Sequence, residues 1–113
     1  EATGTELAKT ASAVIARAVD VTDTAGVRKF VDDVAAAWGG VDVLVNNASA
    51  IHPKGLLDTP MKRYDLMMDV NVRGSFVCAQ ACMPHLLRAA NPHVLTLAPP
   101  LDLQAKWWAP HVA

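Results

Sequence analysis

The stretch VDVLVNNASA, which runs from Val41 to Ala50, decides the fold class of this chain. Val41–Val45 is rich in apolar and β-branched residues, and two asparagines and three small residues follow it directly. An apolar strand that ends in small polar residues is typical of an open α/β sheet, which binds its ligands across the carboxyl ends of its strands. The stretch therefore predicts a buried strand over 41–45 and a ligand-facing turn after it.

Toward the N-terminus, the sequence predicts a helix and, before it, another strand. Ala13–Asp20 has the composition of a short strand that ends at an acid, whereas residues 3–9 are only weakly helical. The next segment can be capped by Thr22 or Asp23, and Gly39-Gly40 supplies a left-handed stop. Between these ends, apolar residues recur every three or four positions and predict one buried helix face: Val27, Phe30, Val31, Val34 and Trp38.

Toward the C-terminus, the sequence predicts a long helix and a third strand. Thr59 as a cap and Pro60 at the first helical position start a helix over about 60–90, in which Gly74 and Pro84 are the irregular points. His93–Ala98 then reads as a strand that Pro99-Pro100 stops. Alternating strands and helices favour right-handed crossovers and a parallel sheet with helices on both faces.

Composition excludes several classes of function. The 113 residues suffice for one domain, and a net charge of −1 with both signs interspersed argues against nucleic-acid or membrane-surface partners. No apolar run approaches the roughly 18 residues of a spanning helix. Cys78 and Cys82 lie four residues apart on the predicted long helix, where a disulfide is geometrically poor. Two reduced thiols predict a cytoplasmic protein.

Three motifs in order carry a family resemblance. They are Asp20-Val21-Thr22-Asp23 after one predicted strand, Asn46-Asn47-Ala48-Ser49 after the next, and Asn71-x-x-Gly74 in the long helix. Together they resemble the short-chain dehydrogenase/reductase family, over a region from about residue 14 to the C-terminus. The resemblance implies a Rossmann-type doubly wound parallel sheet that binds NAD or NADP, of which this chain supplies only a central segment.

The resemblance also assigns roles to particular residues. It implies that Asp20 and the Val21 backbone contact the adenine of the cofactor, and that Asn47, Ala48 and Ser49 let the backbone approach the ribose closely. Asn71 corresponds to the family's helix asparagine, which holds a water in the proton relay. From the residues alone, other roles remain open: Asp20 as a helix-entry cap, Asn46-Asn47 as turn residues and Asn71 as a filler at a helix kink.

Other family features are missing from this sequence. The family's general acid/base is a tyrosine with a lysine four residues later, but Tyr64 has Met68 at that spacing, which favours a packing or surface role. The position of the family's serine is occupied by Ala98 or Pro99, and no glycine-rich phosphate loop occurs. The chain also begins at Glu1 rather than Met, so we expect residues 1–113 to be a partial dinucleotide-binding domain of a longer protein.

The sequence thus predicts an NAD(P)-dependent oxidoreductase that interconverts a small carbonyl compound and a secondary alcohol. One alternative is a catalytically impaired, cofactor-binding or dimerising member of the same fold, and a second is a Rossmann-like methyltransferase. In the family the long helix commonly packs against another subunit, which implies a homodimer or tetramer through residues 60–90.

Three further groups of residues are candidates for chemistry. Cys78, Cys82 and His85 share a helical face, but the lack of a fourth ligand favours a core or interface face over a metal site. Trp107-Trp108 could cover a hydrophobic substrate or could simply pack in the protein, and the sequence favours neither interpretation. His52 lies just past the Asn-Asn-Ala-Ser turn, and a solvated loop histidine is the favoured interpretation over a substrate contact.

Overall fold

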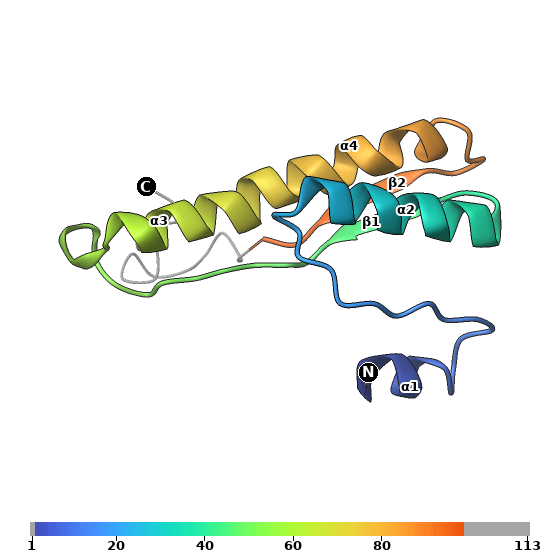
Figure 1. The fold of residues 1–113 in the computed structure, drawn as a ribbon, viewed down its shortest axis with the longest axis horizontal. Helices are drawn as coiled ribbons and strands as arrows, with labels where there is room; N and C mark the ends of the chain where they lie inside the picture. The colour runs from blue at the N-terminus through green and yellow to red at the C-terminus, as the bar shows by residue number, and fades with distance from the viewer. Residues whose placement is uncertain (1, 99–113) are drawn as a thin grey trace.

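The computed structural model of this chain describes residues 2–98, in which two parallel strands pack against helices (Figure 1). The helical crossover between the two strands agrees with the predicted α/β class. In chain order the elements are α1 (Ala2–Leu7), α2 (Thr24–Trp38), β1 (Val43–Asn46), the 3₁₀ turn η1 (Leu56–Asp58), α3 (Met61–Met67), the π-helical η2 (Met68–Gly74), α4 (Ser75–Leu86) and β2 (His93–Thr96).

Both ends of α2 form as the sequence predicts. The side chain of Asp23 accepts a hydrogen bond from the Ala25 amide at 3.1 Å, so Asp23, rather than Thr22, is the cap. At the other end Gly39 has a φ of 86°, and its N–H donates to the Ala35 carbonyl at 2.8 Å. A side chain is strained at this positive φ, which explains why glycine ends the helix.

The sheet pairs β1 with β2 in parallel, with Val43 opposite His93 and Asn46 opposite Thr96. Backbone bonds from the His93 amide to the Asp42 carbonyl and from the Leu97 amide to the Asn46 carbonyl flank this ladder. The strands are therefore shorter than predicted, and β1 begins two residues later than Val41. Because the strands are parallel, their carboxyl ends lie at the same edge of the sheet.

The predicted strand over Ala13–Asp20 does not form, and that prediction was wrong. These residues carry no strand structure, and they pair with neither β1 nor β2. A strand exists only where a neighbour completes its ladder of hydrogen bonds. Strand composition alone therefore cannot produce a strand here.

The predicted long helix is present but is divided into α3, η2 and α4. The π-helical turn ends at Gly74, as expected of an irregular point, whereas α4 continues through Pro84 and ends at Leu86, earlier than the predicted residue 90. The predicted Thr59 cap was wrong, because its hydroxyl donates instead to the Gly55 carbonyl at 2.9 Å. Pro60 consequently takes the cap position.

The core lies between the helices and one face of the sheet. Val31 of α2 packs with Cys82 and Leu86 of α4, and Leu44 of β1 packs against this cluster. The helices α2 and α4 therefore share one face of the sheet, and the predicted cover on both faces is absent from residues 2–98. Both helices contribute to one core cluster that packs against Leu44 of β1, which accounts for this arrangement.

An apolar groove of about 270 Å³ is lined by β1, and no residue of β2 contributes to it. Its lining comes from Val19, Val21, α2, α4 and residues 41–45, and includes Phe30, Val34, Val43, Val45 and Cys78. One edge of β1 has no partner strand among the described residues.

Across residues 2–98, no helix has the length and apolar character needed to cross a membrane.

Candidate functional site

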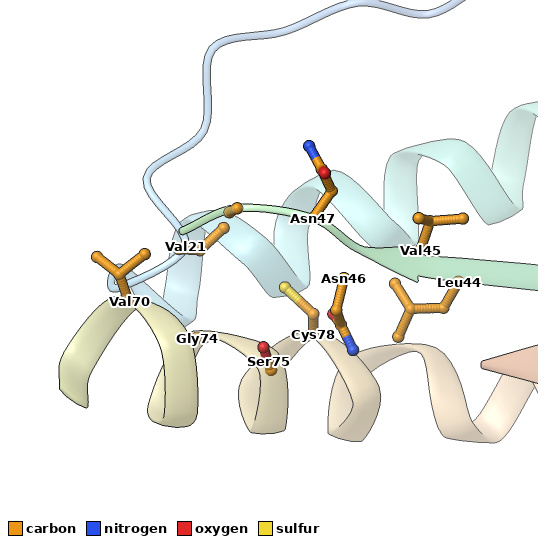
Figure 2. Close-up of a pocket in the computed structure, with 10 residues that line it drawn as sticks. Val21, Leu44, Val45, Asn46, Asn47, Val70, Gly74, Ser75 and Cys78 are labelled. Carbon is orange, nitrogen blue, oxygen red and sulfur yellow. The ribbon is translucent and has the colours of Figure 1, made fainter. Parts of the chain in front are cut away.

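A cavity of about 60 Å³ lies where β1 ends, between the turn after the strand and the helix η2–α4 (Figure 2). It is bounded by three segments that are far apart in the sequence. A space of this size holds one or two waters, so a larger ligand would lie over the exposed turn rather than inside it. The lining residues are Val21, Leu44, Val45, Asn46, Asn47, Ala48, Val70, Gly74, Ser75 and Cys78.

The two asparagines that end β1 point in opposite directions. In Figure 2 the Asn46 side chain lies on the side of Ser75 and Cys78, whereas Asn47 points to the other side of the chain. Asn46 is half-buried, and its Nδ2 donates to the Thr96 hydroxyl at 3.3 Å, which links the carboxyl ends of both strands. Asn47, like Ala48 and Ser49 after it, is exposed. Asn46 therefore supports the sheet, and the next three residues are accessible to a ligand.

Gly74 lets the segment around Val21 approach the helix closely. A Cβ atom on Gly74 would lie 2.9 Å from Cγ2 of Val21 and 3.2 Å from its Cβ. Both separations are shorter than ordinary van der Waals contact, and Gly74 itself is buried. Because Gly74 has no side chain, Val21 has room to pack against the helix at the rim of the cavity.

Asn71 holds the loop that follows β1. Its Oδ1 accepts a hydrogen bond from the Ala50 amide at 2.8 Å, and its Nδ2 donates to the Ala50 carbonyl at 2.9 Å. The hydroxyl of Ser75 donates to the Asn71 carbonyl at 2.9 Å. Asn71 lies in η2, and π-helical turns recur at functional sites. In this structure the Asn71 side chain therefore holds the backbone of Ala50, the residue that directly follows Asn47–Ser49.

Asp20 forms a tight turn at the same edge of the sheet. Its Oδ1 accepts hydrogen bonds from the amide and the hydroxyl of Thr22, at 2.9 and 2.8 Å. These bonds, the backbone one first, lower the pKa of the Asp20 carboxyl below its ordinary value. The group is therefore ionised at neutral pH, and its second oxygen has no partner within residues 2–98.

The structure gathers some of the predicted site residues and separates others. Val21, Asn47 and Ala48 surround the cavity, whereas Asp20 and Ser49 lie outside its lining. The helical contributors Val70, Ser75 and Cys78 were not predicted. The spacing of Val70, Gly74 and Cys78 by four residues already indicates a shared helical face, and this pattern could have identified two of them.

The cysteine face of α4 packs in the interior. Cys82 is 3% exposed in the core cluster, which confirms the predicted packing role. Burial raises the pKa of both thiols, and the neighbouring Cys78 adds to the shift at Cys82. His85 accepts a hydrogen bond from Arg88 at 3.1 Å. Among the described side chains, no three potential metal ligands gather at one point.

Of the remaining candidate residues, some lie within residues 2–98 and others lie outside them. Tyr64 is 39% exposed on α3, and Ala98 is exposed just past β2. His52 contradicts the favoured interpretation of a solvated histidine, because it is half-buried and its enclosed Nε2 has no hydrogen-bond partner among residues 2–98. The predictions for Pro99, Trp107 and Trp108 fall outside the described residues.

The geometry suits the adenosine part of a nicotinamide dinucleotide. An ionised carboxylate with a free oxygen can accept a hydrogen bond from an amino group, and the exposed small residues after Asn47 leave the backbone open to a sugar. Val21 and the turn residues Asn47 and Ala48 line the same cavity, so these two segments lie close together. Both lie at the carboxyl edge of the sheet, where such folds bind nucleotides.

Comparison with known proteins shows the family of this chain. A family model described as short chain dehydrogenase matches residues 1–99. The chain is 47% identical, over 95 residues, to hydroxysteroid dehydrogenase-like protein 2 of Danio rerio. It is also 43% identical to a crystallised short chain dehydrogenase from Mycobacterium thermoresistibile, with a TM-score of 0.71. A short chain dehydrogenase from Burkholderia cenocepacia J2315, crystallised in complex with NADP, is 34% identical with a TM-score of 0.75.

These alignments cover most of this chain but a minor part of each relative. They include 84% of the chain and 23% of the Danio rerio protein, 80% and 32% for the Mycobacterium structure, and 84% and 38% for the Burkholderia structure. The matched part contains the sheet edge, the turn after β1 and the helix with Asn71 and Gly74. Because the family model spans residues 1–99 and a relative is 47% identical over 84% of the chain, the chain belongs to the short-chain dehydrogenase family.

Proposed function

We propose that residues 1–113 are a partial dinucleotide-binding domain of a cytoplasmic oxidoreductase, which uses NAD or NADP to interconvert a carbonyl compound and a secondary alcohol. The observation that carries the proposal is the convergence of Val21, Asn47 and Ala48 around one cavity at the carboxyl edge of the sheet. The two free thiols support the cytoplasmic location.

The described residues would hold the cofactor from one side. The free oxygen of Asp20 would accept a hydrogen bond from the adenine amino group, with the Val21 backbone beside it. The backbone of Asn47–Ser49 would lie against the ribose, since small side chains allow that approach. When bound, the nicotinamide ring supplies or accepts the hydride of the reaction.

Asn71 would serve both binding and proton transfer. Its two bonds to Ala50 fix the loop after β1. A carboxamide retains one further N–H and one further lone pair beyond these bonds, and these can hold a water. We assign that water to the proton relay that the family resemblance implies for this position.

The first prediction concerns cofactor binding by the natural polypeptide that carries this sequence. Titration with NADPH and with NADH should quench protein fluorescence saturably, with one of the two preferred. The variant Ala48→Leu should bind at least about tenfold more weakly, because a larger side chain blocks the backbone approach to the ribose.

The control for this prediction is Ala90→Leu, an exposed site beyond α4. It should bind both nucleotides as the unchanged protein does. Equal affinities for all three proteins, or no quenching by either nucleotide, would count against the proposed site. The intact mass of the natural polypeptide, compared with 12.0 kDa, tells whether further family elements accompany these residues.

A second candidate is a cofactor-binding member of the family with impaired catalysis. Ala98 favours it, because an alanine offers no hydroxyl to orient a carbonyl at the position of the family's serine. Saturable nucleotide binding without turnover of ketones or secondary alcohols would support this candidate over the first. The methyltransferase alternative has no support from the dehydrogenase matches.

We also propose that the helix η2–α4 forms a homo-oligomer interface. Four exposed large apolar side chains follow one another at helical spacing along it: Val72, Phe76, Met83 and Leu87. Phe76 and Leu87 are 65% and 77% exposed. Burying such a stripe against a second copy would remove it from water, at roughly 25 cal/mol per Å².

The prediction is that Phe76→Arg reduces the mass of the assembly in solution. Sedimentation velocity should show a dimer or tetramer for the unchanged protein and a species of half that mass, or less, for the variant. A buried arginine without a partner opposes association. Leu7→Arg, on the exposed helix α1, is the matched control, and identical sedimentation of both variants would refute the interface.

A further inference from the structure

The cavity at the end of β1 is lined by polar side chains from both the strand and the helix. Asn46 lines it from β1 and Ser75 from α4, and Figure 2 shows the Asn46 side chain on the side where Ser75 and Cys78 lie. Both polar residues are half-buried. The cavity thus brings hydrogen-bonding groups of the sheet and of the helix to one place.

Each of these two side chains can form hydrogen bonds beyond those it makes in the structure. The Ser75 hydroxyl donates its proton to the Asn71 carbonyl at 2.9 Å, and the lone pairs of its oxygen can still accept. Asn46 uses one N–H, which donates to the Thr96 hydroxyl at 3.3 Å, and within residues 2–98 its Oδ1 accepts no bond. A partly buried carboxamide oxygen is costly to leave without a donor. Both oxygens therefore call for the same kind of partner, a hydrogen-bond donor.

Water matches this cavity in size and in chemistry. The volume of about 60 Å³ admits one or two waters, and a larger molecule would not fit inside it. A water can donate two hydrogen bonds, one to the Ser75 oxygen and one to Oδ1 of Asn46. Waters inside proteins are held by polar partners of this kind, and removing such a water is costly. A water held by both residues would link the strand to the helix.

We propose that this cavity is a water site, in which one ordered water bridges the Ser75 hydroxyl and the Asn46 carboxamide. Ser75 is then a positioning residue, because it acts on the cofactor through the water and Asn46. The residues directly after Asn46 are Asn47–Ser49, whose backbone is proposed to lie against the ribose. The inference rests on the proposed function, and it adds a residue that holds this turn in place.

The first test is a crystal structure of the natural polypeptide, with and without NADPH, at a resolution that shows ordered water. Electron density for a water should lie within hydrogen-bond distance of both Ser75 Oγ and the Asn46 carboxamide. A dry cavity, or a water that contacts only one of the two residues, would overturn the inference.

Binding measurements test the positioning role. Ser75→Ala and Asn46→Ala should each weaken NADPH binding about threefold, and the double variant should bind about as the weaker single variant does, rather than about ninefold more weakly. The reason is that losing either partner already releases the shared water. Ser75→Thr keeps the hydroxyl and should stay within about twofold of the unchanged protein. The matched control is Ser12→Ala, at an exposed serine outside the cavity, which should leave the affinity unchanged.

The outcomes separate the two proposals. If NADPH binds but the two single losses multiply in the double variant, the positioning role is overturned and the proposed function stands. The same conclusion follows if Ser75→Thr weakens binding as much as Ser75→Ala does. If NADPH does not bind to the unchanged protein, the proposed function fails and the positioning role fails with it, while the crystal structure still decides the water site.

Discussion

Replacing Gly74 by alanine is expected to weaken NADPH binding by about tenfold and to destabilise the fold by about 1–2 kcal/mol. The added Cβ would lie 2.9 Å from Cγ2 of Val21, and the Cβ of that valine, at 3.2 Å, cannot rotate away. The backbone around Val21 must therefore shift at the place where the adenine is proposed to bind. Alanine has a better helix propensity than glycine by up to about 1 kcal/mol, and the expected destabilisation of about 1–2 kcal/mol already includes this gain. Fluorescence titration and urea unfolding of the natural polypeptide measure the two effects.

Gly40→Ala is the matched control for this substitution. A Cβ at Gly40 would meet no heavy atom within 4 Å, so its effect should stay within about 0.5 kcal/mol. If Gly74→Ala and Gly40→Ala bind NADPH equally well, the close approach of Val21 to the helix plays no part in cofactor binding.

Replacing Asn71 by leucine is expected to lower the free energy of unfolding by about 2–4 kcal/mol. The substitution leaves the amide and the carbonyl of Ala50 without their partners, and both bonds are partly buried. Because Ala50 directly follows Asn47–Ser49, NADPH affinity should fall as well. Urea unfolding, followed by circular dichroism, gives the change in stability.

Two further variants test the cause of this loss. Asn71→Asp keeps an acceptor for the Ala50 amide but loses the donor to its carbonyl, so at neutral pH it should also be destabilised. Asn91→Leu replaces an exposed asparagine in the turn before β2 and should change stability by less than about 0.5 kcal/mol. Equal stability of Asn71→Leu and Asn91→Leu would contradict the contribution of the Asn71–Ala50 bonds.

Local chemistry explains which elements the sequence predicts well. Asp23 caps α2 with its own carboxylate and Gly39 ends it at a positive φ, and both effects involve residues within one helical turn. The apolar spacing gives the buried Val27 and Val31 of the same helix, because helical period and burial coincide there, whereas Trp38 at the end of the predicted face is 53% exposed. Such features depend on near neighbours, so they can be derived before the fold is known.

The errors arise where a distant partner decides the outcome. Residues 13–20 have strand composition but no strand to pair with, and Thr59 bonds the Gly55 carbonyl instead of capping α3. His52 has the neighbourhood of a solvated loop residue in the sequence, whereas tertiary packing encloses its Nε2.

The sequence by itself determined the α/β class, the order of the motifs and the family, because each motif combines a local backbone requirement with a fixed place in the chain. Only the tertiary structure decided that Asn71 clamps Ala50, that Val21 packs on Gly74 and that both helices share one face of the sheet. These contacts join residues 21 to 53 positions apart in the sequence. Their geometry follows from how the crossovers fold back on the sheet, which no local pattern specifies.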